Sequence, residues 1–331
     1  MQAQLIALDW GTSSLRAYKL GAGGQVLEQR ALGYGIMQLP SQPREVNGQP
    51  CADGFELAFD EACGDWLRAQ PGLPVIACGM VGSAQGWVQA PYCATPARVA
   101  DLSAAMVPVH SVSGVTLQVV PGVVQNSALP NVMRGEETQV LGLLQGLPAD
   151  SRNDALLIGL PGSHSKWVSV VEGRIVHFDT FMTGEIFAAL SAHTILGRTQ
   201  ERSGAFDSVA FERGVQVAQS CDGDIGPLST VFSARTLGLT GQLPGRAQPD
   251  YLSGLLIGHE LRSLGEVLRA RSKSTRLPEV MLIGNDQLCE RYRRALQACE
   301  FPAVDVAAQA TERGLWSLAL AAGLVTDLTD H

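Results

Sequence analysis

Charge of either sign is scarce in this 331-residue sequence, and basic charge is the scarcer. Only 17% of the residues are charged, and the formal net charge is −8. A nucleic-acid-binding protein needs surplus Lys and Arg to neutralise phosphates, so this balance argues against that class. No apolar run approaches the roughly 20 residues of a membrane-spanning helix. The N-terminus has no basic region, so we expect no signal peptide and a cytoplasmic location.

The seven cysteines match neither a metal site nor a disulfide framework. No two stand as a Cys-x-x-Cys pair, and no histidine spacing completes a zinc site. Because their number is odd, we expect reduced thiols, several of them in the core. Hydrophobic residues make up 46% of the chain, which is typical of a well-packed globular protein of one or two domains.

Two common nucleotide-binding motifs are also missing. There is no Gly-x-x-x-x-Gly-Lys-Ser/Thr P-loop. A dinucleotide-binding unit needs a glycine-rich turn that leads from strand to helix, whereas here the turn after the apolar run 5–8 leads into a second strand-like run, 15–20. A Rossmann oxidoreductase is therefore disfavoured. A parallel strand and a helix directly after Asp9 would instead favour a Rossmann oxidoreductase.

What the sequence does contain is one pattern repeated in its two halves. Each half is expected to open with three strands joined by turns, and to continue with alternating helices and strands. In the first half the strands are 5–8, 15–20, 25–29, 75–78 and 117–120, and the helices are 55–68 and 136–147. In the second half the strands are 155–158, 166–171, 174–178, 280–283 and 303–306, and the helices are 251–271, 286–299 and 312–324. A tight hairpin turn is expected at Glu172-Gly173.

A polar, breaker-rich segment, 148–154, separates the halves and predicts domains at 1–149 and 150–331. Two such meanders, each followed by alternating helices and strands, resemble the actin/hexokinase/Hsp70 superfamily. The predicted fold class is therefore α/β, a two-lobed actin-like ATPase (ribonuclease H-like) fold. The resemblance implies that the two opening hairpins hold the phosphates of ATP across a cleft. The last helix is a candidate for packing back on the first lobe.

The turn between the first two strands is similar to the first phosphate motif of sugar kinases. Asp9 ends a buried strand, where a carboxylate can hold hydrated Mg²⁺. Gly11 allows close approach of backbone to phosphate, and Thr12, Ser13 and Ser14 offer hydroxyl and N–H donors. Arg16 is a candidate for neutralising the transferred phosphate or a substrate carboxylate. An ordinary polar hairpin turn is the alternative.

The matching turn of the second half offers Gly162, Ser163, His164 and Lys166 as phosphate ligands. A solvated histidine is the alternative for His164. The commonest sugar-kinase pattern opens this hairpin with Asp, but Gly159 and Leu160 stand here, which points to a particular branch of the superfamily.

Two further segments lie where a strand meets a helix. Gly284 and Asn285 resemble the adenosine motif, and Asn285 is equally placed to cap the following helix. Glu136 and Glu137 open a helix of the first half, where a sugar kinase places its catalytic base. Glu136 is the first candidate and Glu137 the second, and an acidic helix N-terminus favoured by the dipole is the alternative. Arg134 is a candidate partner for a substrate carboxylate.

Taken in order, these segments resemble the 2-dehydro-3-deoxygalactonokinase family over nearly the whole chain. The segments that carry the resemblance are 77–83, 86–87, 90–92, 133–139, 161–168, 182–185 and 252–258. The stretches around Arg134 and Lys166 are the most family-specific. In this family the second hairpin lacks the opening Asp, and Ser163 stands where the family has Thr.

The resemblance implies transfer of the γ-phosphate of ATP to the 6-hydroxyl of 2-dehydro-3-deoxy-D-galactonate, with Mg²⁺, in galactonate catabolism. Met80, Ser83, Trp87 and Tyr92 are candidate sugar-acid contacts, with core or rim positions as the alternative. Glu185 is a candidate metal ligand, or simply a helix-start carboxylate.

Two other functions remain open from the sequence. One is a kinase of another 2-keto-3-deoxy acid or sugar on the same fold. The other is an acceptor-independent ATPase or a nucleotide-binding regulator, which would usually carry an additional DNA-binding or partner module. The expected partners are a sugar acid and ATP, with neither nucleic acid nor membrane, and a homodimer is a candidate assembly.

Overall fold

The computed structural model describes residues 2–148, 155–201, 205–272, 277–302 and 304–326. The chain forms two compact units. Unit 1 contains Met1–Ala155, Ser169–Phe178 and Ala308–His331, and unit 2 contains Leu156–Val168 and Asp179–Ala307. The predicted boundary at 149/150 lies outside the described residues, so the predicted domain extents stay a prediction.

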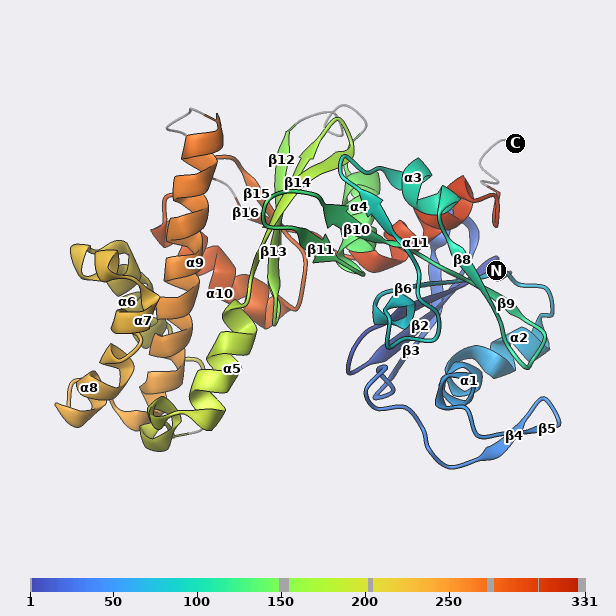
Figure 1. The fold of residues 1–331 in the computed structure, drawn as a ribbon, viewed down its shortest axis with the longest axis horizontal. Coiled ribbons are helices and arrows are strands. Elements are labelled where there is room, and N and C mark those ends of the chain that lie inside the picture. Colours follow the sequence, from blue (N-terminus) through green and yellow to red (C-terminus); the bar gives the residue numbers. More distant parts are fainter. Residues whose placement is uncertain (1, 149–154, 202–204, 273–276, 303, 327–331) are drawn as a thin grey trace. The chain divides into compact units, whose positions relative to one another are not determined.

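Unit 1 is built on a six-stranded sheet with the order β3-β2-β1-β6-β9-β8 (Figure 1). Its strands are β1 (Leu5–Trp10), β2 (Leu15–Leu20), β3 (Val26–Leu32), β6 (Val75–Cys78), β8 (Val107–His110) and β9 (Thr116–Val119). A three-stranded sheet, β7 (Tyr92–Ala94), β10 (Gly122–Gln125) and β11 (Asn131–Met133), and a hairpin, β4 (Arg44–Val46) and β5 (Gln49–Cys51), complete the strands of this unit. The antiparallel β1–β2 pair sets Asp9 opposite Arg16, and the parallel β1–β6 pair sets Asp9 beside Cys78.

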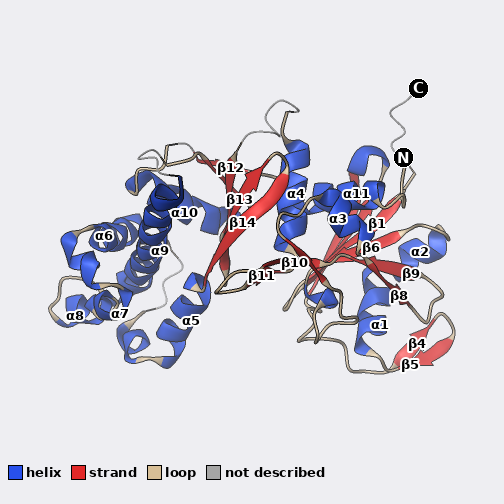
Figure 2. Ribbon diagram, turned by 45° about the horizontal axis from the view of Figure 1, so that its top comes forward, coloured by secondary structure: helices blue, strands red, loops and turns tan. Residues whose placement is uncertain are grey.

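Helices cover both faces of this sheet (Figure 2). They are α1 (Gly54–Phe59), α2 (Asp65–Ala69), α3 (Val99–Ala104), α4 (Glu136–Gly146) and α11 (Ala310–Ala321). A π-helical turn, Asp60–Gly64, joins α1 to α2, so the predicted helix over 55–68 is confirmed. Alternation along β1 directs Ile6, Leu8 and Trp10 into the core shared with α1 and α2. The opposite face of β1 is covered by α11, which also packs along α4.

The other main sheet has the order β14-β13-β12-β15-β16. Its strands are β12 (Leu156–Leu160), β13 (Ser165–Val171), β14 (Arg174–Phe181), β15 (Val280–Leu282) and β16 (Val304–Val306). Glu172 and Gly173 both have positive φ, 52° and 68°, and form the predicted hairpin turn. The hairpin tip, 169–178, belongs to unit 1, where Ile175 and Ala97 exchange backbone hydrogen bonds of 2.8 and 3.0 Å.

The helices of unit 2 are α5 (Thr183–His193), α6 (Ser208–Gln219), α7 (Pro227–Thr230), α8 (Ser233–Leu239), α9 (Gln248–Ser272) and α10 (Asp286–Ala298). The long helix α9 packs along α6 and also contacts α5, α8 and α10 (Figure 1). Among the described residues, no helix combines the length and apolar character needed to cross a membrane.

The two main sheets share one plan. Three consecutive strands lie in reverse order, β3-β2-β1 and β14-β13-β12, and the next strands, β6 and β9 or β15 and β16, extend the sheet in parallel beyond the first strand. The predicted repeat is therefore present, with one copy of the sheet in each half of the chain. This confirms the α/β, actin-like (ribonuclease H-like) fold class.

Candidate functional site

The first predicted phosphate turn joins β1 to β2. It is closed by a hydrogen bond from the Gly11 N–H to the Ser14 carbonyl oxygen (2.9 Å). Thr12 and Ser13 stand at its tip with exposed side chains. The turn therefore presents hydroxyl and N–H donors to solvent, as an anion site requires.

A second segment, 35–37, is hydrogen-bonded to the backbone of this turn. The N–H groups of Ile36 and Met37 donate to the carbonyl oxygens of Gly11 and Thr12 (3.0 and 3.1 Å). A Cβ on Gly35 would lie 2.2 Å from the Thr12 oxygen, so only glycine allows this approach. Gly35 is not among the predicted site residues, although the Gly-Tyr-Gly run at 33–35 is a turn signal.

Asp9 and Arg16 lie opposite each other at the base of the turn. The Arg16 Nη1 donates to the Asp9 Oδ2 at 3.5 Å, a long contact. The Arg16 side chain is 55% exposed and that of Asp9 19%. Burial raises the pKa of the Asp9 carboxyl, and the Arg16 guanidinium opposes that shift. The Arg16 charge is thus available to a ligand, and at this distance Arg16 neutralises the Asp9 carboxylate only in part.

The two predicted catalytic carboxylates differ in accessibility. Glu137 is fully buried, and it accepts hydrogen bonds from the Gly135 N–H (2.7 Å) and the Thr138 hydroxyl (3.0 Å). Burial, with Glu136 beside it, raises the pKa of Glu137 to about 8. Glu136 is only half-buried and accepts from the Arg134 N–H (3.0 Å). Of the pair, Glu136 is the one that a ligand can reach.

Arg134 is buried with part of its hydrogen-bonding capacity unused. Its Nη2 donates to the Ala90 carbonyl oxygen at 2.8 Å, and its guanidinium lies 4.4 Å from the centre of the Tyr92 ring. Within the described part of the chain, its Nε and Nη1 meet no acceptor, and the buried Ser83 hydroxyl also has no partner. A buried cation with unused donors is costly unless an anion completes it. This combination is typical of a binding site for a carboxylate or phosphate.

The other predicted sugar-acid contacts lie in the same part of unit 1. Met80 is half-buried in a single helical turn after β6, and Tyr92 is 44% exposed. Trp87 stacks on Phe55, with ring centres 5.9 Å apart and planes inclined by 12°. It also meets the Trp10 ring edge-on at 5.9 Å. Trp87 is thus integrated into the aromatic core, and its predicted contact with substrate stays a prediction.

In unit 2, the turn 161–164 between β12 and β13 meets the start of α5. The Glu185 N–H donates to the Ser163 carbonyl oxygen (3.0 Å), and the exposed His164 and Glu185 side chains hydrogen-bond to each other. A Cβ on Gly184 would lie 2.4 Å from the Gly162 oxygen, so glycine is required at this contact. The two predicted segments therefore form one structural element.

Lys166 does not point the way that its neighbours do. Along β13 the side chains alternate, so Ser165 and Trp167 share one face and Lys166 lies on the other. Its Nζ donates to the Thr180 hydroxyl (2.8 Å), and the side chain is buried. Contact between Lys166 and phosphate stays a prediction.

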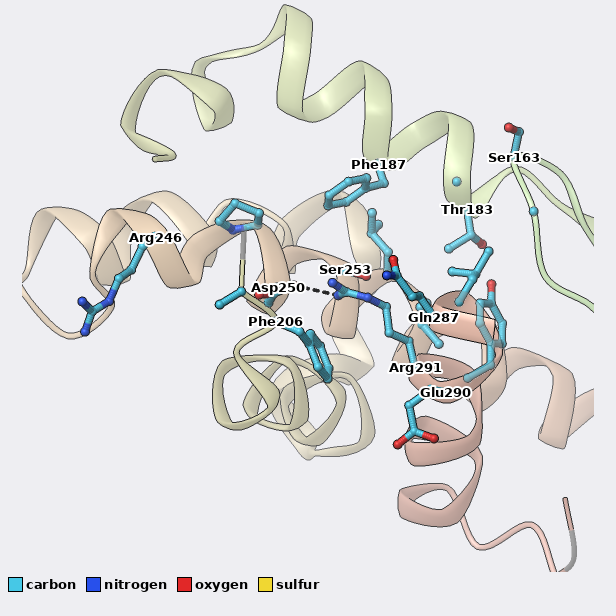
Figure 3. A pocket seen from close by; sticks show the side chains of 18 residues that line it. Ser163, Thr183, Phe187, Phe206, Arg246, Asp250, Ser253, Gln287, Glu290 and Arg291 are labelled. Atoms are coloured by element: carbon cyan, nitrogen blue, oxygen red, sulfur yellow. Dashed lines mark ion pairs between the residues drawn. The ribbon is translucent and has the colours of Figure 1, made fainter. Parts of the chain in front are cut away.

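A cavity of ≈ 740 Å³ opens inside unit 2 beside the turn 161–164 (Figure 3). Within it the Arg291 guanidinium lies over the Phe206 ring, 4.2 Å from its centre, and pairs with Asp250 at 2.7 Å. Its lining comprises Gly162, Ser163, Thr183, Gly184, Phe187, Ala205, Phe206, Arg246, Pro249, Asp250, Ser253, Leu256, Ile257, Gln287, Leu288, Glu290, Arg291 and Tyr292. The lining combines apolar and aromatic side chains with polar and charged ones, as a site for a polar small molecule requires. Most of these residues are not among the predicted site residues.

The predicted adenosine motif adjoins this cavity. Asn285 caps α10, since its Oδ1 accepts from the Gln287 and Leu288 N–H groups (3.0 and 3.4 Å). A Cβ on Gly284 would lie 3.5 Å from the Pro161 oxygen, which places the motif next to the turn 161–164. Gln287 and Leu288 line the cavity, so the cap of α10 also shapes its wall.

Within each unit, segments that carry the family resemblance lie next to one another, and the comparison with known sequences agrees. The model of the 2-keto-3-deoxy-galactonokinase family matches residues 9–318. The chain belongs to this family. Family membership confirms the predicted enzyme class, a kinase of a sugar acid that uses ATP as co-substrate.

Individual members are similar over almost their full length. The probable 2-dehydro-3-deoxygalactonokinase of Rhizobium meliloti (strain 1021) is 35% identical over 323 residues, 95% of this chain and 96% of its own. The 2-dehydro-3-deoxygalactonokinase of Escherichia coli (strain K12) is 33% identical, over 95% of this chain and 98% of its own. A crystal structure of a Sinorhizobium meliloti protein assigned to the same activity superposes with a TM-score of 0.80 at 32% identity, over 96% of this chain and 98% of its own.

Proposed function

We propose that this kinase transfers the γ-phosphate of ATP to the 6-hydroxyl of 2-dehydro-3-deoxy-D-galactonate, giving the 6-phosphate in galactonate catabolism. The observation that carries the proposal is the segment Arg134–Glu136, which combines a buried cation with unused donors and an accessible carboxylate. The Arg134 cation can bind the acid group of the substrate. The Glu136 carboxylate can accept the proton of the hydroxyl that is phosphorylated.

Arg134 binds the substrate carboxylate in this proposal. The pair would be charge-assisted and shielded from water, and it would engage donors that otherwise remain unused. The unpartnered Ser83 hydroxyl and the Tyr92 ring, which stacks on the guanidinium, complete the subsite. A neutral sugar would leave the buried guanidinium uncompensated, which disfavours the alternative of a neutral acceptor.

Glu136 acts as the base. Phosphoryl transfer to an alcohol passes through a loose transition state, so the hydroxyl proton leaves late and the base mainly aligns the oxygen. Glu136 is accessible, whereas the buried Glu137 is held by the Gly135 N–H and by the Thr138 hydroxyl. Glu137 therefore positions the start of α4, and Arg16 offers its exposed charge to the transferred phosphate.

The cavity of unit 2 receives the nucleoside of ATP. Its Phe206 ring and its Arg291 guanidinium offer flat surfaces to a purine, and the turn 161–164 with Gly184 offers backbone donors to phosphate. The turn 11–14 of unit 1 offers the same kind of donors. The predicted roles of Gly284 and Asn285 fit this assignment, because the α10 cap shapes the cavity wall.

Asp9 would hold the Mg²⁺ that accompanies ATP, with Glu185 as the second candidate. In kinases Mg²⁺ is bound by one or two carboxylates together with phosphate oxygens and water. The Asp9 carboxylate fits, because it is partly exposed and its contact with Arg16 is long. Among the described residues no group of three or more His, Cys, Asp or Glu side chains gathers, which also fits this mode. When bound, the ion neutralises charge on the phosphates.

The test is ADP release by the purified protein with Mg-ATP and one of three additions. We expect turnover with 2-dehydro-3-deoxygalactonate and little without an acceptor. Turnover with the gluconate epimer alone would keep the enzyme class and change the substrate. Equal ADP release without any acceptor would contradict the proposal and favour an ATPase.

A further inference from the structure

A carboxylate that none of the predicted motifs contains lies in the middle of α9. Glu260 is 3% exposed, and its side chain is surrounded by groups from three other elements of unit 2. A buried charge of this kind is unfavourable unless hydrogen bonds compensate it, so the position calls for a physical explanation.

Glu260 accepts hydrogen bonds from two of those elements and is close to the third. The Trp167 Nε1 of β13 donates to its Oε1 at 2.7 Å, and the Tyr292 hydroxyl of α10 donates to its Oε2 at 2.8 Å. The Thr183 side chain at the start of α5 is a third neighbour, which lowers the pKa of this carboxyl. Ser165, the first residue of β13, is hydrogen-bonded to the Tyr292 hydroxyl at 2.8 Å. One side chain of α9 thus connects β13, α5 and α10.

Strand β13 and helices α5 and α10 also surround the part of the cavity that is next to the turn 161–164. Thr183 and Tyr292 line it directly, and Ser165 follows the turn 161–164 in the chain. Glu260 and Trp167 do not line the cavity, so neither is in a position to contact a ligand there. Any effect of Glu260 on the ligand must therefore pass through the groups that it holds.

An ionised Glu260 can accept from both of these donors, Trp167 and Tyr292, at once, one on each oxygen. An indole N–H can only donate, and a carboxylate can only accept, so the Trp167–Glu260 bond has a fixed direction. With Glu260 ionised, the Tyr292 hydroxyl can only donate to it, so its other hydrogen bond, to Ser165, is one that it accepts. Burial raises the pKa of Glu260 to about 7, while the hydrogen bonds from Thr183, Trp167 and Tyr292 oppose that shift, so at pH 8 the carboxylate is mostly ionised.

We propose that Glu260 is a positioning residue of the nucleotide site, which fixes Thr183, Tyr292 and the turn 161–164 for the ATP phosphates. The inference rests on the proposed function, because it takes the cavity of unit 2 as the ATP site. It adds a residue outside that cavity whose loss weakens nucleotide binding. The sugar-acid residues proposed above lie in unit 1, so they are expected to be unaffected.

The test is Glu260→Gln, assayed at pH 8 with each substrate varied in turn. The amide oxygen can still accept from Trp167, so the variant is expected to fold, but its NH₂ group would face the Tyr292 hydroxyl and reverse that hydrogen bond. We expect the KM for ATP to rise roughly tenfold, as for loss of one hydrogen bond to a charged group, with the KM for the sugar acid unchanged. The dissociation constant of a fluorescent ADP analogue should rise by the same factor.

Glu56→Gln is the matched control. Glu56 is a buried glutamate of unit 1 that accepts from the Ser111 hydroxyl and the Val112 N–H, both at 2.8 Å. Its substitution should leave both KM values within twofold. Trp167→Phe, which removes one donor without touching the cavity lining, should shift the KM for ATP in the same direction as Glu260→Gln.

Two results would overturn the inference. One is an unchanged KM for ATP in both Glu260→Gln and Trp167→Phe. The other is an equal change of both KM values, or a lower kcat alone, which would indicate a merely structural role. If Glu260→Gln does not fold, Trp167→Phe decides between these outcomes. Failure of the proposed function would be distinguishable, since the wild-type protein would then show no sugar-acid-dependent turnover.

Discussion

Arg134→Met tests the proposed carboxylate subsite, because methionine keeps much of the arginine volume and removes its charge. In the wild type, Nε and Nη1 have no acceptor among the described residues, and Nη2 donates to the Ala90 oxygen. A hydrogen bond to a charged group contributes about 1.5–3 kcal/mol. At 1.4 kcal/mol per factor of ten, we expect the KM for the sugar acid to rise roughly 10- to 150-fold.

The stability of the variant should change little. The substitution removes one hydrogen bond to a buried carbonyl, but it also removes a buried charge whose donors are partly unused. Replacing such a charge by an apolar side chain is often nearly neutral, so the free energy of unfolding should stay within about 1 kcal/mol. The change in KM can then be assigned to the site rather than to unfolding.

The assay measures initial rates of ADP release against sugar-acid concentration at saturating Mg-ATP. Arg98→Met is the control, because Arg98 is an exposed arginine of the same unit whose Nε lies 3.7 Å from Asp101. It should leave the KM for the sugar acid unchanged. A KM within twofold of wild type for Arg134→Met would refute the carboxylate assignment.

Three further predictions concern the acidic start of α4 and the turn 161–164. Glu136→Gln should lower kcat by roughly 100-fold or more with both KM values nearly unchanged, and a kcat near wild type in steady-state assays would rule Glu136 out as the base. Burial raises the pKa of Glu137 to about 8 in the folded chain, above its ordinary value of 4.5. Its contribution to the free energy of unfolding is therefore fully present below about pH 4.5 and is lost as the pH rises through 8. Glu137→Gln should accordingly flatten the fall in stability between pH 5 and 8 in urea titrations, and parallel curves for the two proteins would contradict this. Gly184→Ala should raise the KM for ATP and destabilise the chain by about 1–3 kcal/mol, because the added Cβ would lie 2.4 Å from the Gly162 oxygen. Unaltered nucleotide titration and melting curves would show that this contact is not needed.

Much of the architecture follows from local pattern. Alternating apolar runs ended by glycine-rich turns predict the meanders correctly, since strand and turn preferences act within a few residues. The exceptions are short elements such as β7, β10 and β11, and the helices α5 to α8. The apolar face of α5 is weakly marked, because nearly all its residues are apolar or small and only Thr183 is buried.

Functional residues could be predicted where they lie close together in the sequence. Arg134 and Glu136 are neighbours in the sequence, and the structure adds that two Arg134 donors have no partner among the described residues and that Glu136 is only half-buried. The cavity of unit 2 was not predictable, because Phe206, Asp250 and Arg291 come from three distant segments. Sequence spacing alone also does not reveal that Trp87 packs into an aromatic core. The face of Lys166 could have been inferred from strand alternation with Ser165 and Trp167.

The central claim is phosphorylation of the sugar acid at its 6-hydroxyl, and the product itself tests it most directly. Phosphorus and proton NMR of a completed reaction with Mg-ATP and 2-dehydro-3-deoxygalactonate would identify where the phosphate resides. We predict one new phosphomonoester signal, coupled to the two C6 protons and equal in amount to the ADP formed. Inorganic phosphate as the only new phosphorus signal besides ADP, or an ester at another carbon, would contradict the account.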